Sequence, residues 1–97
     1  MPDAMHVVVH RRGPAWKPDV PPFEQTGLRE HVAHYQKLLD DGRLFMGGPF
    51  IDGSGGMMVF EAGVPRETID AVAAQDPAVV SGLLTFDVRP WLPRMRK

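Results

Sequence analysis

The chain lacks cysteine throughout its 97 residues, which excludes disulfide bonds, thiolate metal sites and a cysteine nucleophile. No apolar run approaches the roughly 18 to 20 residues of a membrane span, and Met1-Pro2-Asp3 lacks the basic and apolar regions of a secretory signal. The formal charge of -1 leaves no electrostatic footprint for nucleic acid. We therefore expect a cytoplasmic protein with a single domain, residues 1–97, and no affinity for membranes or nucleic acid. No organic cofactor is implied.

The first quarter of the chain contains a valine-rich segment followed by a proline-rich one. Met5 to Arg11 alternates its side chains and predicts a strand. One face would carry His6, Val8 and His10, and the other would carry Met5, Val7 and Val9. The next segment, Gly13 to Pro22, contains four prolines and Trp16, so it predicts an extended surface loop that is able to cover a cleft.

An amphipathic helix follows this loop. It is predicted to begin near Thr26 or Gly27 and to end before Gly42. With about 100° per residue, one apolar stripe collects Leu28, Val32, Tyr35, Leu38 and Leu39. His31 lies about 55° from the centre of that stripe and His34 about 115° from it. We therefore expect His31 to be partly buried and His34 to be mostly exposed.

The second half of the chain predicts a hairpin, a helix and a last strand. Strands at 44–46 and 57–60 flank the turn 52–56. Pro65 suits the first turn of a second helix, which Pro77 interrupts, and the last strand, 83–88, would end at Pro90. The order strand, helix, strand, strand, helix, strand predicts a ferredoxin-like α+β sandwich (βαββαβ). Because its helices cover one sheet face, we expect a homodimer joined through the other face.

Five short motifs lie along this pattern. They are His31, Gly42-Arg43-Leu44, Gly47-Gly48-Pro49, Asp76-Pro77 and Val88-Arg89-Pro90-Trp91. In this order and spacing the chain resembles the YciI-like, or YCII-related, family of small bacterial proteins, which have the dimeric α+β barrel fold. The resemblance covers most of the chain, and it implies a histidine-aspartate active site at His31 and Asp76.

Such a pair is suited to proton transfer. A histidine titrates near neutral pH, and an aspartate on its other ring nitrogen fixes the tautomer and stabilises the imidazolium. The sequence thus predicts an enzyme of the lyase or isomerase kind that acts on a small organic ligand. The alternatives are a non-catalytic ligand-binding or regulatory dimer and an accessory domain of a neighbouring enzyme. In those cases Asp76 would only cap the helix that begins at Pro77, and His31 would be a satisfied histidine at the edge of the core.

Four further residues are candidates for substrate binding: Gly47, Gly48, Trp16 and His34. Backbone N–H groups near the two glycines are possible oxyanion donors. No Gly-Lys-Ser/Thr follows the glycines, so they do not form a phosphate loop. His31 and His34 also admit interpretation as a metal pair, with Asp76, His6 or His10 as further ligands, but their spacing differs from the usual helical zinc motif. We therefore expect no metal.

Overall fold

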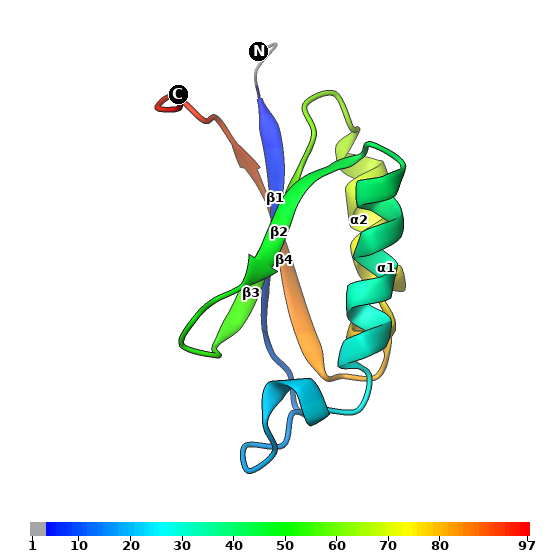
Figure 1. Cartoon of the computed structure of the whole chain (residues 1–97). Helices are drawn as coiled ribbons and strands as arrows, with labels where there is room; N and C mark the ends of the chain where they lie inside the picture. Colours follow the sequence, from blue (N-terminus) through cyan, green and yellow to red (C-terminus); the bar gives the residue numbers. More distant parts are fainter. Residues whose placement is uncertain (1–3) are drawn as a thin grey trace.

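The computed structural model describes residues 4–97. Its four strands form one antiparallel sheet in the order β2-β3-β1-β4, and the helices α1 and α2 cover one of its faces (Figure 1). This is the predicted ferredoxin-like α+β arrangement. No helix in the described range is long and apolar enough to cross a membrane. The elements in chain order are β1 (Met5–Arg12), η1 (Pro22–Glu24), α1 (Leu28–Asp40), β2 (Leu44–Pro49), β3 (Gly55–Phe60), α2 (Arg66–Gln75), α3 (Pro77–Val80) and β4 (Leu84–Trp91).

The central strand β1 divides its side chains between two layers, as its alternation predicts. Val8 pairs with Met58 on one side and with Val88 on the other, and all three belong to the core beneath the helices. The opposite side of the sheet holds a second cluster formed by Met5, Val7 and Val59. We call these two surfaces the inner and outer sheet faces. Because its side chain lies two residues after Val8, His10 is on the inner face.

Helix α1 is rotated relative to its predicted orientation. Its buried residues are His31, Tyr35 and Leu38, whereas Val32 is 57% exposed and Leu39 is 43% exposed. The buried face is turned by about 50° from the apolar stripe, for an ideal helix. The predicted burial of Val32 and Leu39 is therefore wrong. Hydrophobicity alone placed the stripe, but polar partners on the neighbouring segments favour burial of His31, as the site shows.

Pro77 and Pro90 have different effects on the elements that contain them. Pro77 separates α2 from the short helix α3, as predicted. Pro90 does not end the last strand, because β4 continues to Trp91 and pairs Pro90 with His6. Since β4 lies at the sheet edge, a residue without an N–H group is tolerated there. The strands β2 and β3 likewise extend beyond their predicted ends, to Pro49 and from Gly55.

The proline-rich loop between β1 and α1 is tied to the rest of the fold. Gln25 is buried, and its Nε2 donates hydrogen bonds to the carbonyl groups of Lys17, at 2.6 Å, and Val20, at 2.8 Å. The backbone N–H of Lys17 donates in turn to Gln25 Oε1. At the start of the loop, the N–H of Gly13 donates to Leu83 O. These bonds hold the loop, including Trp16, in one position beside the start of α1.

Candidate active site

Asp76 is the fully buried centre of the site. It lies between α2 and α3, where it caps α3: the backbone N–H of Ala78 donates to Asp76 Oδ1 over 2.9 Å. Pro77, the first residue of α3, has no N–H group to satisfy. The predicted helix cap is thus confirmed. Because the cap uses Oδ1, the second oxygen, Oδ2, is left to face α1 and the sheet.

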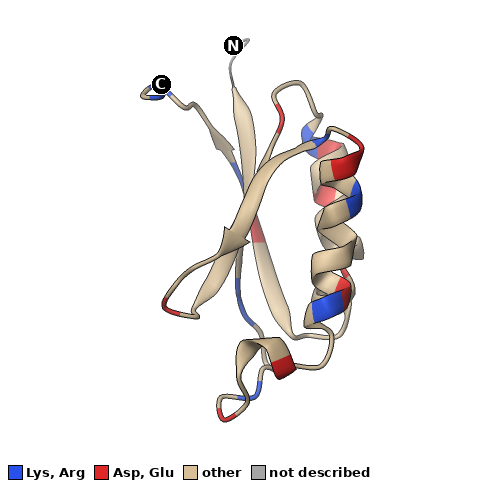
Figure 2. Cartoon of the chain, in the orientation of Figure 1, with Lys and Arg blue, Asp and Glu red and all other residues tan. Residues whose placement is uncertain are grey.

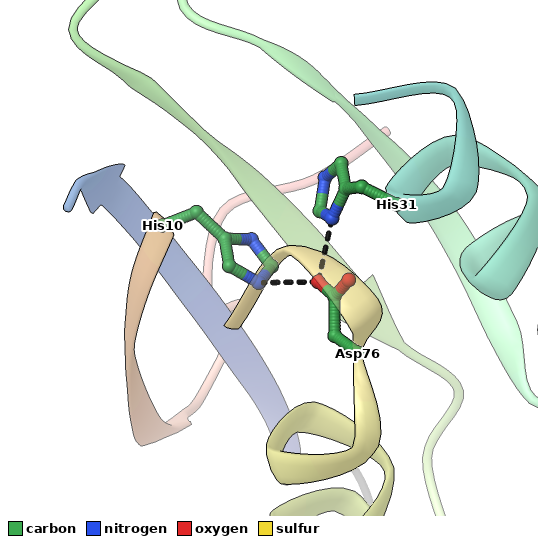
Figure 3. A group of neighbouring side chains, drawn as sticks. All are labelled: His10, His31 and Asp76. Carbon is green, nitrogen blue, oxygen red and sulfur yellow. Dashed lines mark hydrogen bonds and ion pairs between the residues drawn. The ribbon is translucent and has the colours of Figure 1, made fainter. Parts of the chain in front are cut away.

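His31 approaches that second oxygen from α1. Its Nδ1 donates to Asp76 Oδ2 over 2.6 Å, although 45 residues separate the two in the chain. Figure 3 shows the two side chains meeting between the elements that carry them. The side chain of His31 is 9% exposed and that of Asp76 is 0% exposed. The contact is therefore a short, charge-assisted hydrogen bond in a nearly dry environment.

His10 completes a cluster that the motifs did not identify. Its Nε2 lies 3.7 Å from the same Asp76 Oδ2, and its ring is 1% exposed. In Figure 3 the two histidine rings reach this oxygen from different sides. In the sequence His10 was a candidate as a further ligand of a metal pair at His31 and His34. The available signal was its alternation with Val8, which places it on the inner face, but alternation alone does not reveal that Asp76 lies opposite.

Ring contacts fix the orientation of the three aromatic side chains around the carboxylate. The His10 and His31 rings meet edge to face, with centroids 4.9 Å apart and planes at 83°. Tyr35 contacts both rings edge to face, at 5.5 Å from His10 and 5.3 Å from His31. Its hydroxyl oxygen lies 3.5 Å from His10 Nε2. This packing holds each ring in a single orientation toward Asp76.

Burial and the neighbouring charges set the protonation states of the cluster. Burial alone would raise the pKa of Asp76, but the His31 hydrogen bond, the His31 charge and the Ala78 N–H together hold that pKa below its ordinary value. For His10, burial and the nearby His31 lower the pKa to about 4 against the attraction of Asp76. Burial, followed by the Asp76 charge, raises the pKa of Tyr35. At neutral pH Asp76 is therefore ionised, whereas His10 and Tyr35 are neutral.

A groove of about 1040 Å³ opens above these residues, and His10, His31 and Tyr35 form part of its lining. Its lining is largely apolar but includes Arg29, and neither β2 nor β3 carries a charged residue (Figure 2). Exposed hydrophobic side chains along the groove include Phe23, Val32, Leu39, Phe45, Phe50 and Ile51. A small, largely apolar molecule with a few polar atoms matches such a surface.

The predicted substrate-binding residues fall into two groups. Gly47, Gly48 and Trp16 line the groove. Gly47 also allows close packing, because a Cβ there would collide with the Met58 sulfur. His34 lies elsewhere: its Nε2 donates to the carbonyl of Val72 over 2.8 Å, which directs the ring toward α2. This bond also makes His34 partly buried rather than mostly exposed.

The residues close enough to share a metal ion differ from the pair considered in the sequence. His34 bonds to Val72 and does not join His31 in a ligand pair. The ligand atoms within reach of one another belong to His10, His31 and Asp76, all within 4.8 Å. A cation shared by these three would have to displace the proton in the 2.6 Å bond between His31 and Asp76. The arrangement as it stands is better suited to handling protons.

The chemistry available follows from the two nitrogens of His31. Asp76 engages Nδ1, so Nε2 on the other side of the ring is the nitrogen left to exchange a proton with a molecule in the groove. The ionised carboxylate stabilises the positive charge that the ring gains when Nε2 takes that proton. The site thus holds the components of a general acid/base.

Comparison with known proteins bears on both fold and family. No family model matches the chain. The structure of 5-chloro-2-hydroxyhydroquinone dehydrochlorinase (TftG) from Burkholderia phenoliruptrix AC1100, in complex with 2,5-dihydroxybenzoquinone, is similar with a TM-score of 0.59 and 20% identity, over 90% of this chain and 93% of that one. This likeness supports the fold. "Uncharacterized protein YjpA" of Bacillus subtilis (strain 168) is 37% identical over 67 residues, which are 65% of this chain and 78% of the relative. At that identity and coverage, the chain belongs to the same family as YjpA.

Proposed function

We propose that this protein is an enzyme that transfers a proton on a small cyclic organic molecule, with His31 as the general acid or base and Asp76 as its positioning residue. The observation that carries the proposal is the 2.6 Å hydrogen bond from His31 Nδ1 to Asp76 Oδ2, made beside an apolar groove that His31 lines. A buried carboxylate joined to a histidine at the edge of a groove is the arrangement that acid/base catalysis requires.

The substrate class follows from the groove and from one neighbour. A groove with a largely apolar lining and two imidazole rings suits a ring compound bearing a few hydroxyl or carbonyl groups. TftG, which has a similar fold, is a dehydrochlorinase in complex with 2,5-dihydroxybenzoquinone. We extend only the ligand type to this chain: a hydroxylated benzene or quinone, converted in a lyase or isomerase step. The same proposal places the chain in the YciI-like, or YCII-related, family.

The proposal includes a homodimer joined through the outer sheet face. Figure 1 shows that the helices leave this face open. The buried cluster of Met5, Val7 and Val59 lies there, and it is flanked by the exposed side chains of Met46 and Trp91 through their pairing with Val59 and Met5. An apolar strip of this kind is typical of a subunit interface. Sedimentation velocity at micromolar concentration should give a dimer mass, and a monomer mass would contradict this part.

The catalytic part is tested with His31→Asn. The asparagine amide occupies the position of Nδ1 and keeps a donor for Asp76, but it has no group at the position of Nε2. We expect proton transfer to fall by about 10²- to 10⁴-fold. The assay follows exchange of ring hydrogens for deuterium by NMR, and turnover by absorbance, across a panel of chlorinated and unchlorinated hydroquinones and hydroxyquinones.

His34→Gln is the matched control, because it alters a histidine one helical turn away and keeps a donor for Val72 O. We expect its activity to equal that of the parent. Equal activity in His31→Asn and the parent would remove His31 from the mechanism. A parent that binds panel members without exchange or turnover would favour the second candidate, a non-catalytic ligand-binding or regulatory dimer, or an accessory domain. One observation favours that candidate: Asp76 already has a structural role as the cap of α3.

A further inference from the structure

The second ring nitrogen of His10 stands out among the buried polar atoms. Within residues 4–97, His10 Nδ1 is the one buried side-chain nitrogen or oxygen without a hydrogen-bond partner. Native proteins satisfy roughly 90% or more of such groups, and each exception calls for an explanation, of which a catalytic or binding role is one. His10 also lines the groove. The missing partner is therefore to be sought in the groove.

The charge of Asp76 decides which nitrogen of His10 carries the proton. The ring is neutral at neutral pH, so it has one N–H group and one lone pair. Nε2 lies 3.7 Å from the ionised Asp76 Oδ2 and 3.5 Å from the Tyr35 hydroxyl, and both oxygens accept hydrogen bonds. A lone pair at that position would face a negative charge. The proton accordingly belongs on Nε2, which leaves Nδ1 as an acceptor.

The neighbouring strand β3 places no side chain opposite His10. His10 pairs directly with Gly56 of β3, and both residues line the groove. Gly56 has no side chain, and the backbone of Gly48 and Pro49 lies close to the position that its Cβ would take. In Figure 3 a dashed line joins one ring nitrogen of His10 to Asp76, and none reaches the other nitrogen. His10 belongs to the lining of the groove, so a molecule in the groove is the partner that this buried acceptor would take.

We propose that His10 Nδ1 is a substrate-binding group that accepts a hydrogen bond from a hydroxyl group of the ligand. The ligand then has two polar contacts: a hydroxyl group held by His10 and a proton-exchanging atom at His31 Nε2. The second contact rests on the proposed function. Both imidazole rings are oriented through one oxygen of Asp76. The site therefore selects hydroxylated rings over their O-methyl ethers, which have the same shape but no donor.

Two measurements test the assignment. In the unmodified protein, nitrogen-15 NMR of the histidine rings at pH 7 should show His10 as the neutral Nε2–H tautomer. The His10 Nδ1 resonance should then shift when hydroquinone is added and stay in place with 1,4-dimethoxybenzene. A His10 ring that carries its proton on Nδ1, or one that does not respond to hydroquinone, would overturn the proposal.

A pair of substitutions separates the two nitrogens of His10. In His10→Asn the amide oxygen replaces the Nδ1 acceptor, whereas in His10→Gln the amide reaches only the position of Nε2. We expect hydroquinone affinity to remain within about threefold of the parent in His10→Asn and to weaken by about tenfold or more in His10→Gln, the size of one hydrogen bond. Equal weakening in both would overturn the assignment.

The result is separable from that of the proposed function. If the His10 pair behaves as expected and His31→Asn turns over as fast as the parent, the ligand contact holds and the proton-transfer mechanism falls. If His31→Asn loses activity and the two His10 variants bind equally, the mechanism holds and the His10 contact falls. The tautomer measurement requires no variant, so it remains decisive even where a substitution at this buried position disturbs folding.

Discussion

The inner sheet face has two regions of opposite character. At one end Phe60, Ile69 and Ala73 are fully buried in a core that contains only apolar contacts and the Tyr35 ring. At the other end a carboxylate and two histidines are buried together, and one nitrogen has no partner. Tyr35 joins the regions, because its ring packs against Phe60 while its hydroxyl faces His10.

The apolar region stabilises the fold, whereas the polar region supplies the groups of the candidate site. Burying apolar groups in close packing stabilises a domain, whereas burying ionisable groups opposes folding unless each is fully paired. The Asp76 carboxylate is paired through the Ala78 N–H and His31, but His10 is only half paired. A region that gives up stability in this way is expected where function requires it.

The largest effect should come from truncating the apolar region. Phe60→Ala removes a fully buried ring and should lower the free energy of unfolding by about 3–5 kcal/mol, measured by urea denaturation. The matched truncation in the polar region, His10→Ala, should lower it by only about 1–2 kcal/mol, because it also removes an unpaired buried nitrogen. A larger loss for His10→Ala than for Phe60→Ala would contradict the view that the apolar region contributes more to stability.

The next largest effect should be a loss of stability in acid. We expect this loss to come from the polar region. The pKa of His10 is lowered to about 4 in the folded protein, against about 6.5 in the unfolded chain. Between these values the unfolded state binds more protons, so stability falls as the pH falls. From pH 7 to pH 5 this group should remove about 2 kcal/mol from the free energy of unfolding.

Urea denaturation at the two pH values measures this loss, with His10→Asn as the comparison because it cannot titrate. The lowered pKa of Asp76 has the same sign but acts in a separate window. Its stabilisation is present above the ordinary aspartate pKa, near 3.9, and is lost as the pH falls through the lower folded value. An equal loss between pH 7 and pH 5 in the parent and in His10→Asn would show that other groups cause it.

A smaller effect should separate two glycines that line the groove. A Cβ on Gly56 would lie 2.8 Å from the Gly48 carbonyl oxygen, whereas a Cβ on Gly48 meets no atom within 4 Å. Gly56→Ala should thus lower the free energy of unfolding by about 1 kcal/mol, near the lower end of the usual effect of overpacking, because the edge strand β2 is able to shift. Gly48→Ala should leave the free energy of unfolding unchanged, with both variants measured by urea denaturation. Equal shifts would contradict this packing.

The smallest effect should come from the residue that joins the regions. Tyr35→Phe keeps the ring in the apolar core and removes only the hydroxyl, which lies at the long distance of 3.5 Å from His10 Nε2. A hydrogen bond of that length is weak, so we expect a loss of under about 1 kcal/mol by urea denaturation. A loss above that of Gly56→Ala would mean that the hydroxyl supports the cluster more strongly than its distance indicates.

Local patterns predicted most of the secondary structure. The alternation in β1 assigned Val8 and His10 to one face, and Asp76-Pro77 predicted the start of α3. The rotation of α1 was not predicted, because hydrophobicity favours burial of Val32 and Leu39 while the actual packing buries His31. The extension of β4 through Pro90 also depends on its place at the sheet edge, which no local pattern records.

The candidate site shows the same division more sharply. By itself the sequence determined the residue types, the order of the elements and the cap at Asp76, since these depend on neighbours a few residues away. Only the tertiary structure decided that His10, His31 and Asp76 meet at one oxygen, because they come from a strand, a helix and a helix junction far apart in the chain. Burial and pairing then set which of these groups carries charge. That follows from the environment formed by folding, which the residues taken singly do not contain.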